Sequence, residues 1–147
     1  MTATVSPSTV VAARSEDRRR RLVGPVVTIG GLALATLALH VRDPHQSGSW
    51  GFCPSAAMGV YCPGCGGLRA VNDLTDGHVG AAASSNLLLV ALVPLAVFLL
   101  GRWTYDRWTG RVREPHPRRT AVLLWSLAGV ALVFVVLRNL PGSWLAP

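Results

Sequence analysis

Three uncharged apolar segments separate all the charges of this 147-residue chain. Residues 22–41, 79–100 and 120–137 contain none of its 14 arginines and none of its 7 acidic residues. As helices, at about 1.5 Å per residue, they reach roughly 27–33 Å, close to the hydrocarbon thickness of a bilayer. Helices of a soluble bundle usually show a polar face, and the third segment has almost none. The pattern predicts an all-α membrane protein with three transmembrane helices.

The segments between these spans differ sharply in arginine content. We expect a disordered basic tail over residues 1–21, an outer loop over residues 42–78, a basic loop over residues 101–119 and a short outer tail over residues 138–147. Arginine is concentrated in the first tail and in the basic loop, and such segments stay in the cytoplasm. The sequence therefore predicts a plasma-membrane protein with a cytoplasmic N-terminus. The first apolar segment is longer than the core of a typical signal peptide, so we expect an uncleaved anchor.

The formal net charge of +7 could indicate nucleic-acid binding, but its distribution argues against it. The arginine run 18–21 has no aromatic residues between its members, and the segments outside the spans cannot build a nucleic-acid-binding fold. Topology and contact with lipid headgroups explain the run more simply. We therefore expect the lipid bilayer as the partner, with another membrane protein as a further candidate and no nucleic acid.

The predicted outer loop contains every cysteine of the chain: Cys53, Cys62 and Cys65. The last two form a Cys-x-x-Cys motif that is followed by Gly66 and Gly67, and glycine gives the backbone freedom to turn. Residues 68–76 then predict a short helix on the outer face, ended by the Asp-Gly pair. Within that helix Arg69 and Asp73 are four residues apart and can pair.

Three interpretations of the cysteine motif remain open from the residues alone. Two of the three cysteines could form a structural disulfide that pins the loop, which an oxidising outer compartment permits. The motif could instead be a redox dithiol, although no thioredoxin-like strand and helix pattern surrounds it. Finally, Cys53, Cys62 and Cys65 could provide three of the four ligands of a zinc ion, with His78 or His45 as the fourth. We predict no cofactor, and zinc stays one of the open alternatives.

Asn86 is a polar residue near the start of the second apolar segment. An amide at this depth seeks a hydrogen-bond partner. The side chain could bond Arg69 or the backbone carbonyls around residues 65–67 if the short helix folds back towards the membrane. Alternatively it faces interfacial water.

The order of these elements resembles a known pattern. The residues that carry the resemblance are Cys53-Pro54, Cys62-Pro63-Gly64-Cys65-Gly66-Gly67-Leu68-Arg69-Ala70, Gly77, the alanines 81–83 and Asn86. They are similar to the signature of the domain-of-unknown-function 2752 family of bacterial membrane proteins, over about a third of the chain. The resemblance implies a small multi-pass membrane protein with no established reaction.

Two residues depart from that family pattern. Leu68 stands where the family usually has threonine, and Leu87 follows Asn86 where the family usually has proline. The second change removes a signal for the start of a helix.

No set of residues in the sequence indicates an enzyme. We see no carboxylate dyad, no phosphate-binding loop and no serine and histidine arrangement. We expect a membrane protein of unknown biochemical activity, leaning towards a non-enzyme, whose outer cysteine loop is a structural or interaction module. The alternative is a membrane thiol–disulfide or zinc-handling protein that uses Cys62 and Cys65.

Overall fold

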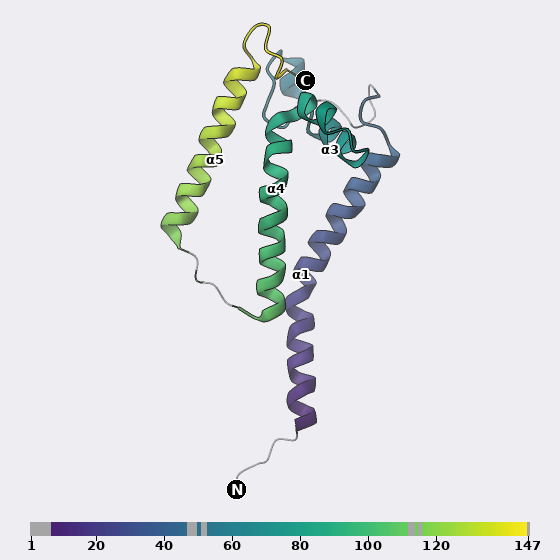
Figure 1. Ribbon diagram of the computed structural model, residues 1–147, viewed down its shortest axis with the longest axis vertical. Coiled ribbons are helices and arrows are strands. Elements are labelled where there is room, and N and C mark those ends of the chain that lie inside the picture. Colours follow the sequence, from purple (N-terminus) through teal and green to yellow (C-terminus); the bar gives the residue numbers. More distant parts are fainter. Residues whose placement is uncertain (1–6, 47–49, 51–52, 112–113, 115, 147) are drawn as a thin grey trace.

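The computed structural model describes residues 7–46, 50, 53–111, 114 and 116–146, and the side chains from residue 17 onward. Within these residues all regular secondary structure is helical. The helices, shown in Figure 1, are α1 (Pro7–Val41), α2 (Pro54–Ala57), α3 (Gly67–Thr75), α4 (Val79–Thr109) and α5 (Pro117–Arg138).

Three of these helices are long and apolar enough to cross a membrane. The candidate spans are Asp17–Val41, Val79–Thr109 and Pro117–Arg138, with mean hydropathies of 2.1, 2.3 and 2.5 in their most apolar windows. Only 6% to 11% of each window is buried inside the protein. Such apolar, exposed helices are stable where lipid covers them. The predicted all-α membrane fold is confirmed.

The first helix begins earlier than the sequence predicts. Because α1 starts at Pro7, residues 7–21 are helical, whereas the sequence analysis assigned them to a disordered tail. Alanine, arginine and glutamate in this stretch favour helix, and proline is well suited to a first helical turn. The arginine run 18–21 thus continues the helix that contains the first apolar segment. The predicted helix over residues 68–76 is observed as α3, displaced by one residue.

The helices do not pack against one another equally. The main contacts join α3 to α4, α1 to α4 and α1 to α3. Figure 1 shows α3 lying across the ends of α1 and α4, while α5 diverges from both along its length. Helix α5 is attached through its C-terminal residues Arg138 and Asn139, which bond the cysteine loop. The structural centre of the fold is therefore at the cysteine end, where the loop, α3, the start of α4 and the end of α5 meet.

Helix α4 contains an interruption that the hydropathy pattern does not show. Asn86 has extended backbone angles (φ −160°, ψ 93°), so the helix stops and begins again at this residue. The Asn86 Oδ1 accepts a hydrogen bond of 2.9 Å from the backbone N–H of Leu89, as an N-cap residue does three positions before its donor. Asn86 therefore starts the second part of α4 without the proline that usually follows it.

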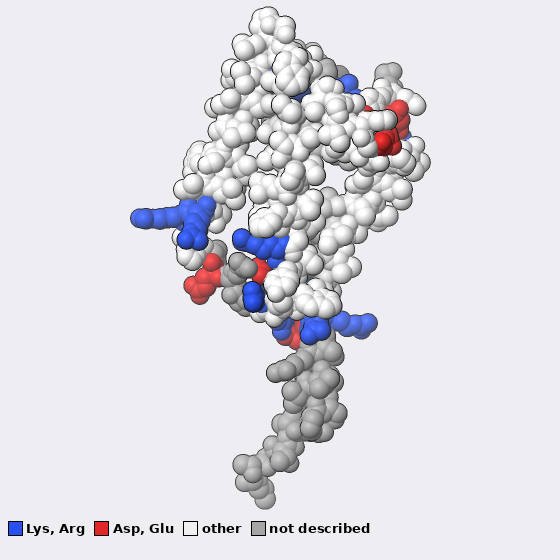
Figure 2. Space-filling view, viewed as in Figure 1, with Lys and Arg blue, Asp and Glu red and all other residues white. Residues whose placement is uncertain are grey.

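Charge is divided between the two ends of the bundle. Figure 2 shows arginines gathered around the C-terminal end of α4, the start of α5 and the adjoining part of α1. This arginine end lies opposite the cysteine end, and Figure 2 shows acidic residues both among the arginines and in a patch at the cysteine end. The spans between the two ends present almost no charge.

Candidate functional site

The cysteine loop brings its three thiols together by two tight turns. Cys53 is the N-cap of the short helix α2, whose first residue is Pro54. In the second turn the backbone N–H of Cys65 donates to the carbonyl of Cys62 at 3.1 Å. Gly66 follows with φ of 75°, a left-handed conformation that favours glycine, and α3 begins at the next residue. The predicted role of glycine in the turn is confirmed for Gly66, whereas Gly67 is the first residue of α3.

The three thiols form one compact cluster. The Sγ of Cys65 lies 3.2 Å from that of Cys62 and 3.5 Å from that of Cys53, and all three sulfurs lie within 4.8 Å of one another. A disulfide needs about 2.05 Å between its sulfurs, so the cysteines are adjacent but not bonded. The Ser55 Oγ adds a fourth polar atom, 3.2 Å from the Cys53 Sγ and 3.8 Å from the Cys65 Sγ.

The three thiols differ in exposure and in acidity. Hydrogen bonding to the Ser55 hydroxyl and to backbone N–H groups lowers the pKa of the exposed Cys53 to about 7. The hydrogen bond to Cys65 lowers the pKa of Cys62, which is half-buried, and the backbone N–H of Gly64 contributes in the same direction. Burial raises the pKa of Cys65, the most enclosed thiol. Two of the three sulfurs are thus disposed to form thiolates, which are the nucleophilic and metal-binding form.

Asn86 holds the cysteine turn against the interruption in α4. Its side chain is 1% exposed, and its Nδ2 donates to the carbonyls of Pro63 at 2.9 Å and Cys65 at 3.0 Å. Of the two interpretations drawn from the sequence, the bond to carbonyls near residue 65 is correct, and a water-facing amide is wrong. The lack of a side chain at Gly67 allows the start of α3 to lie close to α4. A Cβ at this position would be only 3.3 Å from a methyl carbon of Leu89.

The end of α5 holds the same turn from the opposite side. Arg138 is 1% exposed, and its Nη1 donates to the carbonyls of Cys62 at 3.1 Å and Cys65 at 3.2 Å. The next residue, Asn139, pairs with the backbone of Tyr61, accepting its N–H at 2.8 Å and donating to its carbonyl at 2.9 Å. The carbonyl of Cys65 is therefore shared between Arg138 and Asn86, which joins α4 and α5 through the loop.

Helix α3 links the cysteine loop to the end of α1. The Nδ2 of Asn72, 5% exposed, donates to the carbonyl of Leu39 at 2.9 Å. That carbonyl is in the last turn of α1, where backbone acceptors lack partners within the helix. Helix α3 therefore caps α1, while the N-terminus of α3 follows directly on the cysteine turn.

A second polar cluster lies beside α3, apart from the thiols. The ring of His45 is 2.8 Å from an Asp43 oxygen through Nδ1 and 3.3 Å from an Asp73 oxygen through Nε2. The backbone N–H of His45 also donates to Asp43 and is the main reason the pKa of that carboxyl is lowered. Asp73 further accepts a hydrogen bond from Ser85 at 3.1 Å. The sequence paired Asp73 with Arg69, whereas within the described residues its ion pair is with His45.

The histidines expected to complete a zinc site are not in the thiol cluster. Among the described residues, the group close enough to hold one metal ion consists of Cys53, Cys62 and Cys65 alone. His78 is exposed and precedes α4 as its N-cap, and His45 pairs with aspartates. The three cysteines lie together as expected, and neither of the histidines considered as a fourth ligand belongs to this group. The Ser55 hydroxyl lies beside the cluster instead, within 3.8 Å of two of the sulfurs.

Comparison with known proteins bears on the central part of this site. The family described as "Protein of unknown function (DUF2752)" matches residues 53–100. We call residues 53–100 the DUF2752 segment, after the family model that matches them. No curated protein and no solved structure matches the chain. The resemblance drawn from the cysteine motif is confirmed, and it assigns no activity.

The DUF2752 segment contains all three cysteines and Asn86, but the site extends beyond it. Arg138 and Asn139, which bond the carbonyls of the cysteine loop, lie outside the matched residues. The sequence analysis counted Arg138 only as a charge of the outer tail and did not single out Asn72 or Asn139. A charged residue directly after an apolar span was the available signal, and its burial became apparent only in three dimensions.

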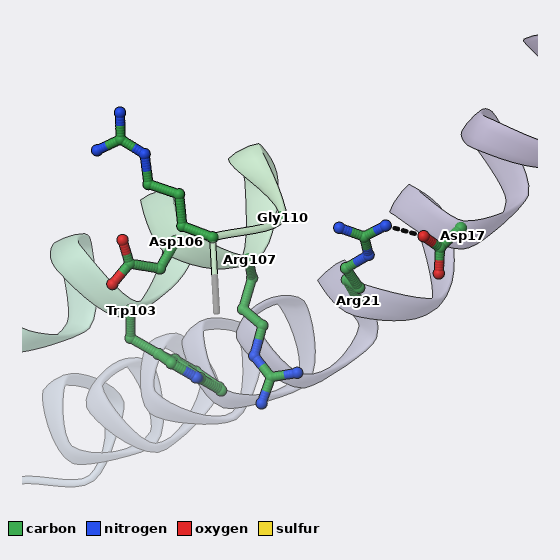
Figure 3. Close-up of a pocket in the computed structure, with 7 residues that line it drawn as sticks. Asp17, Arg21, Trp103, Asp106, Arg107 and Gly110 are labelled. Atoms are coloured by element: carbon green, nitrogen blue, oxygen red, sulfur yellow. Dashed lines mark ion pairs between the residues drawn. The ribbon is translucent and has the colours of Figure 1, made fainter. Parts of the chain in front are cut away.

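The arginine end has a pocket of its own, outside the DUF2752 segment. This pocket has a volume of about 660 Å³ and lies between α1 and the end of α4. Figure 3 shows residues that line it, among them Asp17, Arg21, Trp103, Asp106 and Arg107. Arg21 pairs with Asp17 in its own helix, and the Arg107 guanidinium lies 5.9 Å from the Trp103 ring centroid. Charges of both signs and aromatic faces suit a headgroup boundary. No thiol lies here, so the distinctive chemistry of the chain is at the cysteine end.

Proposed function

We propose that this membrane protein uses its cysteine loop as a metal–thiolate module on the outer side of the membrane, with zinc as the metal. The convergence of three sulfurs within 4.8 Å of one another carries the proposal. Zinc binds cysteine sulfur at about 2.3 Å and prefers four ligands. An ion among the three sulfurs would join Cys53 to the turn that precedes α3, which makes the module structural and non-enzymatic.

The surroundings of the sulfurs support this chemistry. Metal ligation requires thiolates, and the lowered pKa of Cys53 and of Cys62 favours that form near neutral pH. Buried donors hold the backbone of the loop in place, namely Asn86 and Arg138. A site held in this way loses little conformational freedom when an ion binds, so more of the binding free energy is retained.

Metal analysis of the purified full-length chain tests the proposal. After purification with zinc present, we expect about one zinc ion per chain, lost in Cys62→Ser. Ser84→Ala is the matched control, because Ser84 Oγ bonds only a carbonyl of its own helix. A chain that holds no zinc although all three thiols can be alkylated would contradict the proposal.

A second candidate function rests on the 3.2 Å separation between the Cys62 and Cys65 sulfurs. In thiol–disulfide exchange, one thiolate attacks a partner disulfide and displaces one partner thiolate. The second thiolate then attacks the mixed disulfide, which leaves an intramolecular disulfide here and a reduced dithiol on the partner. Mass spectrometry distinguishes this function, because the oxidised chain has one alkylatable thiol before reduction, three after it, and no zinc.

The outer location of the loop rests on the arginine distribution. Arginines favour the cytoplasmic side, and they gather at the end opposite the cysteines. In intact cells treated with a chelator and a mild reductant, a membrane-impermeant thiol reagent should label Cys53. Labelling that requires cell lysis would reverse the orientation.

A further inference from the structure

Arg138 is a buried cation that makes only some of the hydrogen bonds its guanidinium can donate among the described residues. Its side chain is 1% exposed, and Nη1 donates to the carbonyls of Cys62 and Cys65. Nε and Nη2 are buried as well, and neither has a hydrogen-bond partner among the described residues. Arginine does not lose its proton in proteins, so the positive charge stays in place. A buried charge without compensation is strongly destabilising, and this one therefore calls for an anion nearby.

The groups around Arg138 do not supply that anion as side chains of fixed charge. The guanidinium carbon lies 4.9 Å from the ring centroid of Phe134 and 5.9 Å from that of Tyr61. Aromatic faces attract a cation but carry no net charge. Among the ion pairs of the described residues, none joins a carboxylate to Arg138. The groups beside it that can become anionic in a fixed arrangement are the thiols of the turn whose carbonyls it binds.

We propose that Arg138 is the counter-ion and positioning residue of an anionic metal complex formed by Cys53, Cys62 and Cys65. This inference rests on the proposed function. Three thiolates and one divalent ion carry a net charge of −1, which the guanidinium neutralises. A disulfide between two of the cysteines is neutral, and the one thiol that remains is uncharged whenever it holds its proton, so the buried cation has no permanent counter-charge. Arg138 therefore favours the metal-bound form over the disulfide.

The same charge balance specifies the kind of fourth ligand. With Arg138 and a divalent ion, three thiolates complete a neutral unit, so a fourth anionic ligand leaves an excess negative charge. A neutral oxygen ligand fits instead. The Ser55 hydroxyl, 3.2 Å from the Cys53 Sγ and 3.8 Å from the Cys65 Sγ, is placed at this corner of the cluster.

Two probe ions that form complexes of different charge test this role. Cd(II) with three thiolates gives a complex of charge −1, whereas As(III) gives a neutral one. In the second reaction three thiols displace the three hydroxyl groups of arsenous acid, and each thiol proton leaves with a hydroxyl as water, so three As–S bonds form, three As–O bonds break and three water molecules are released without any change of oxidation state. Affinities for both probes are measured on the full-length chain in detergent, for the unaltered protein and for Arg138→Met, Arg138→Lys and Asn139→Ala.

We expect Arg138→Met to weaken Cd(II) binding at least about tenfold while As(III) binding changes less than about threefold, because only the first complex needs a counter-ion. Arg138→Lys keeps the charge and should retain most of the Cd(II) affinity. Asn139→Ala is the control for loss of a neighbouring contact to the loop. This variant should lower the affinities for Cd(II) and As(III) equally or leave both unchanged.

Two results would overturn the counter-ion role. In the first, Arg138→Met lowers the affinities for Cd(II) and As(III) to the same extent, as expected for a residue that only holds the loop in place. In the second, Arg138→Met leaves the Cd(II) affinity unchanged. Failure of the unaltered chain to bind Cd(II) would remove the proposed metal site itself, and this outcome is distinct from both.

Discussion

The two ends of this bundle are held by different kinds of interaction. At the cysteine end, nearly inaccessible side chains donate to backbone carbonyls of other elements, as Asn72, Asn86 and Arg138 do. At the arginine end, charged groups pair within one helix or lie over aromatic rings, as Arg21 with Asp17 and Arg107 with Trp103 do. The first kind of contact specifies position closely, because an unmade bond leaves a buried group unsatisfied. The second kind tolerates change, because water and lipid headgroups can replace a lost partner.

Removing the amide at the centre of the cysteine end should have the largest effect. Asn86→Leu removes the bonds to the Pro63 and Cys65 carbonyls and the N-cap of Leu89. Since each buried polar group left unsatisfied costs roughly 1–3 kcal/mol, we expect a loss of about 3 kcal/mol in unfolding free energy. Denaturation of the chain in mixed micelles, followed by tryptophan fluorescence, measures this change. A loss no larger than that of Ser84→Ala would show that the loop is held by other contacts.

The second-largest effect should be the difference in reactivity between the thiols of the cysteine end. In the metal-free, reduced chain at pH 7, Cys53 should react with iodoacetamide at least about tenfold faster than Cys65. Cys53 is exposed with a pKa of about 7, whereas burial raises the pKa of Cys65. Below pH 7 the Cys53 rate should fall as its thiolate is protonated. Time-resolved peptide mapping measures both rates, and equal rates would mean that the loop does not distinguish its thiols.

A smaller effect is expected where α3 caps α1. Asn72→Leu removes one buried donor and leaves the Leu39 carbonyl without it, so we expect a loss of about 1–2 kcal/mol. The same denaturation assay applies. Thr109→Ala is a control in which the lost hydroxyl bonds only its own helix. Should the two variants be equally stable, the attachment of α3 to α1 would rest on apolar contacts alone.

The smallest effect should come from the arginine end. Asp17→Asn removes the ion pair with Arg21, in which both side chains are substantially exposed, so the loss in unfolding free energy should stay below about 0.5 kcal/mol. A loss comparable to that of Asn86→Leu would erase the contrast between the two ends.

Much of the architecture could be predicted from the sequence because it depends on quantities that are additive along the chain. Hydropathy places the spans and the glycines place the turn before α3. The Cys-x-x-Cys spacing identifies the loop that matches the DUF2752 family. The sequence analysis missed the helix over residues 7–21, because it assigned this stretch to a disordered terminal tail without weighing its helix propensity.

The composition of the site was harder to predict, because it depends on residues far apart in the chain. Cys62 and Cys65 bond Arg138 across more than seventy positions, and Asn139 pairs with Tyr61 over a similar separation. Hydrophobic periodicity does not indicate which residues so far apart in the chain come into contact. His45 and His78 were considered for a metal site from their proximity in sequence, but His45 pairs with aspartates and His78 is the exposed N-cap residue of α4.

By itself, the sequence determined that the chain has three membrane-crossing helices and that its three cysteines share one loop, since both follow from local composition. Only the tertiary structure decided that the three sulfurs converge with Ser55 beside them, and that a buried arginine from the last helix lies under the turn. The reason is physical: burial and charge compensation are properties of a packed arrangement, and Arg138 becomes an unbalanced cation only after α5 docks on the cysteine loop.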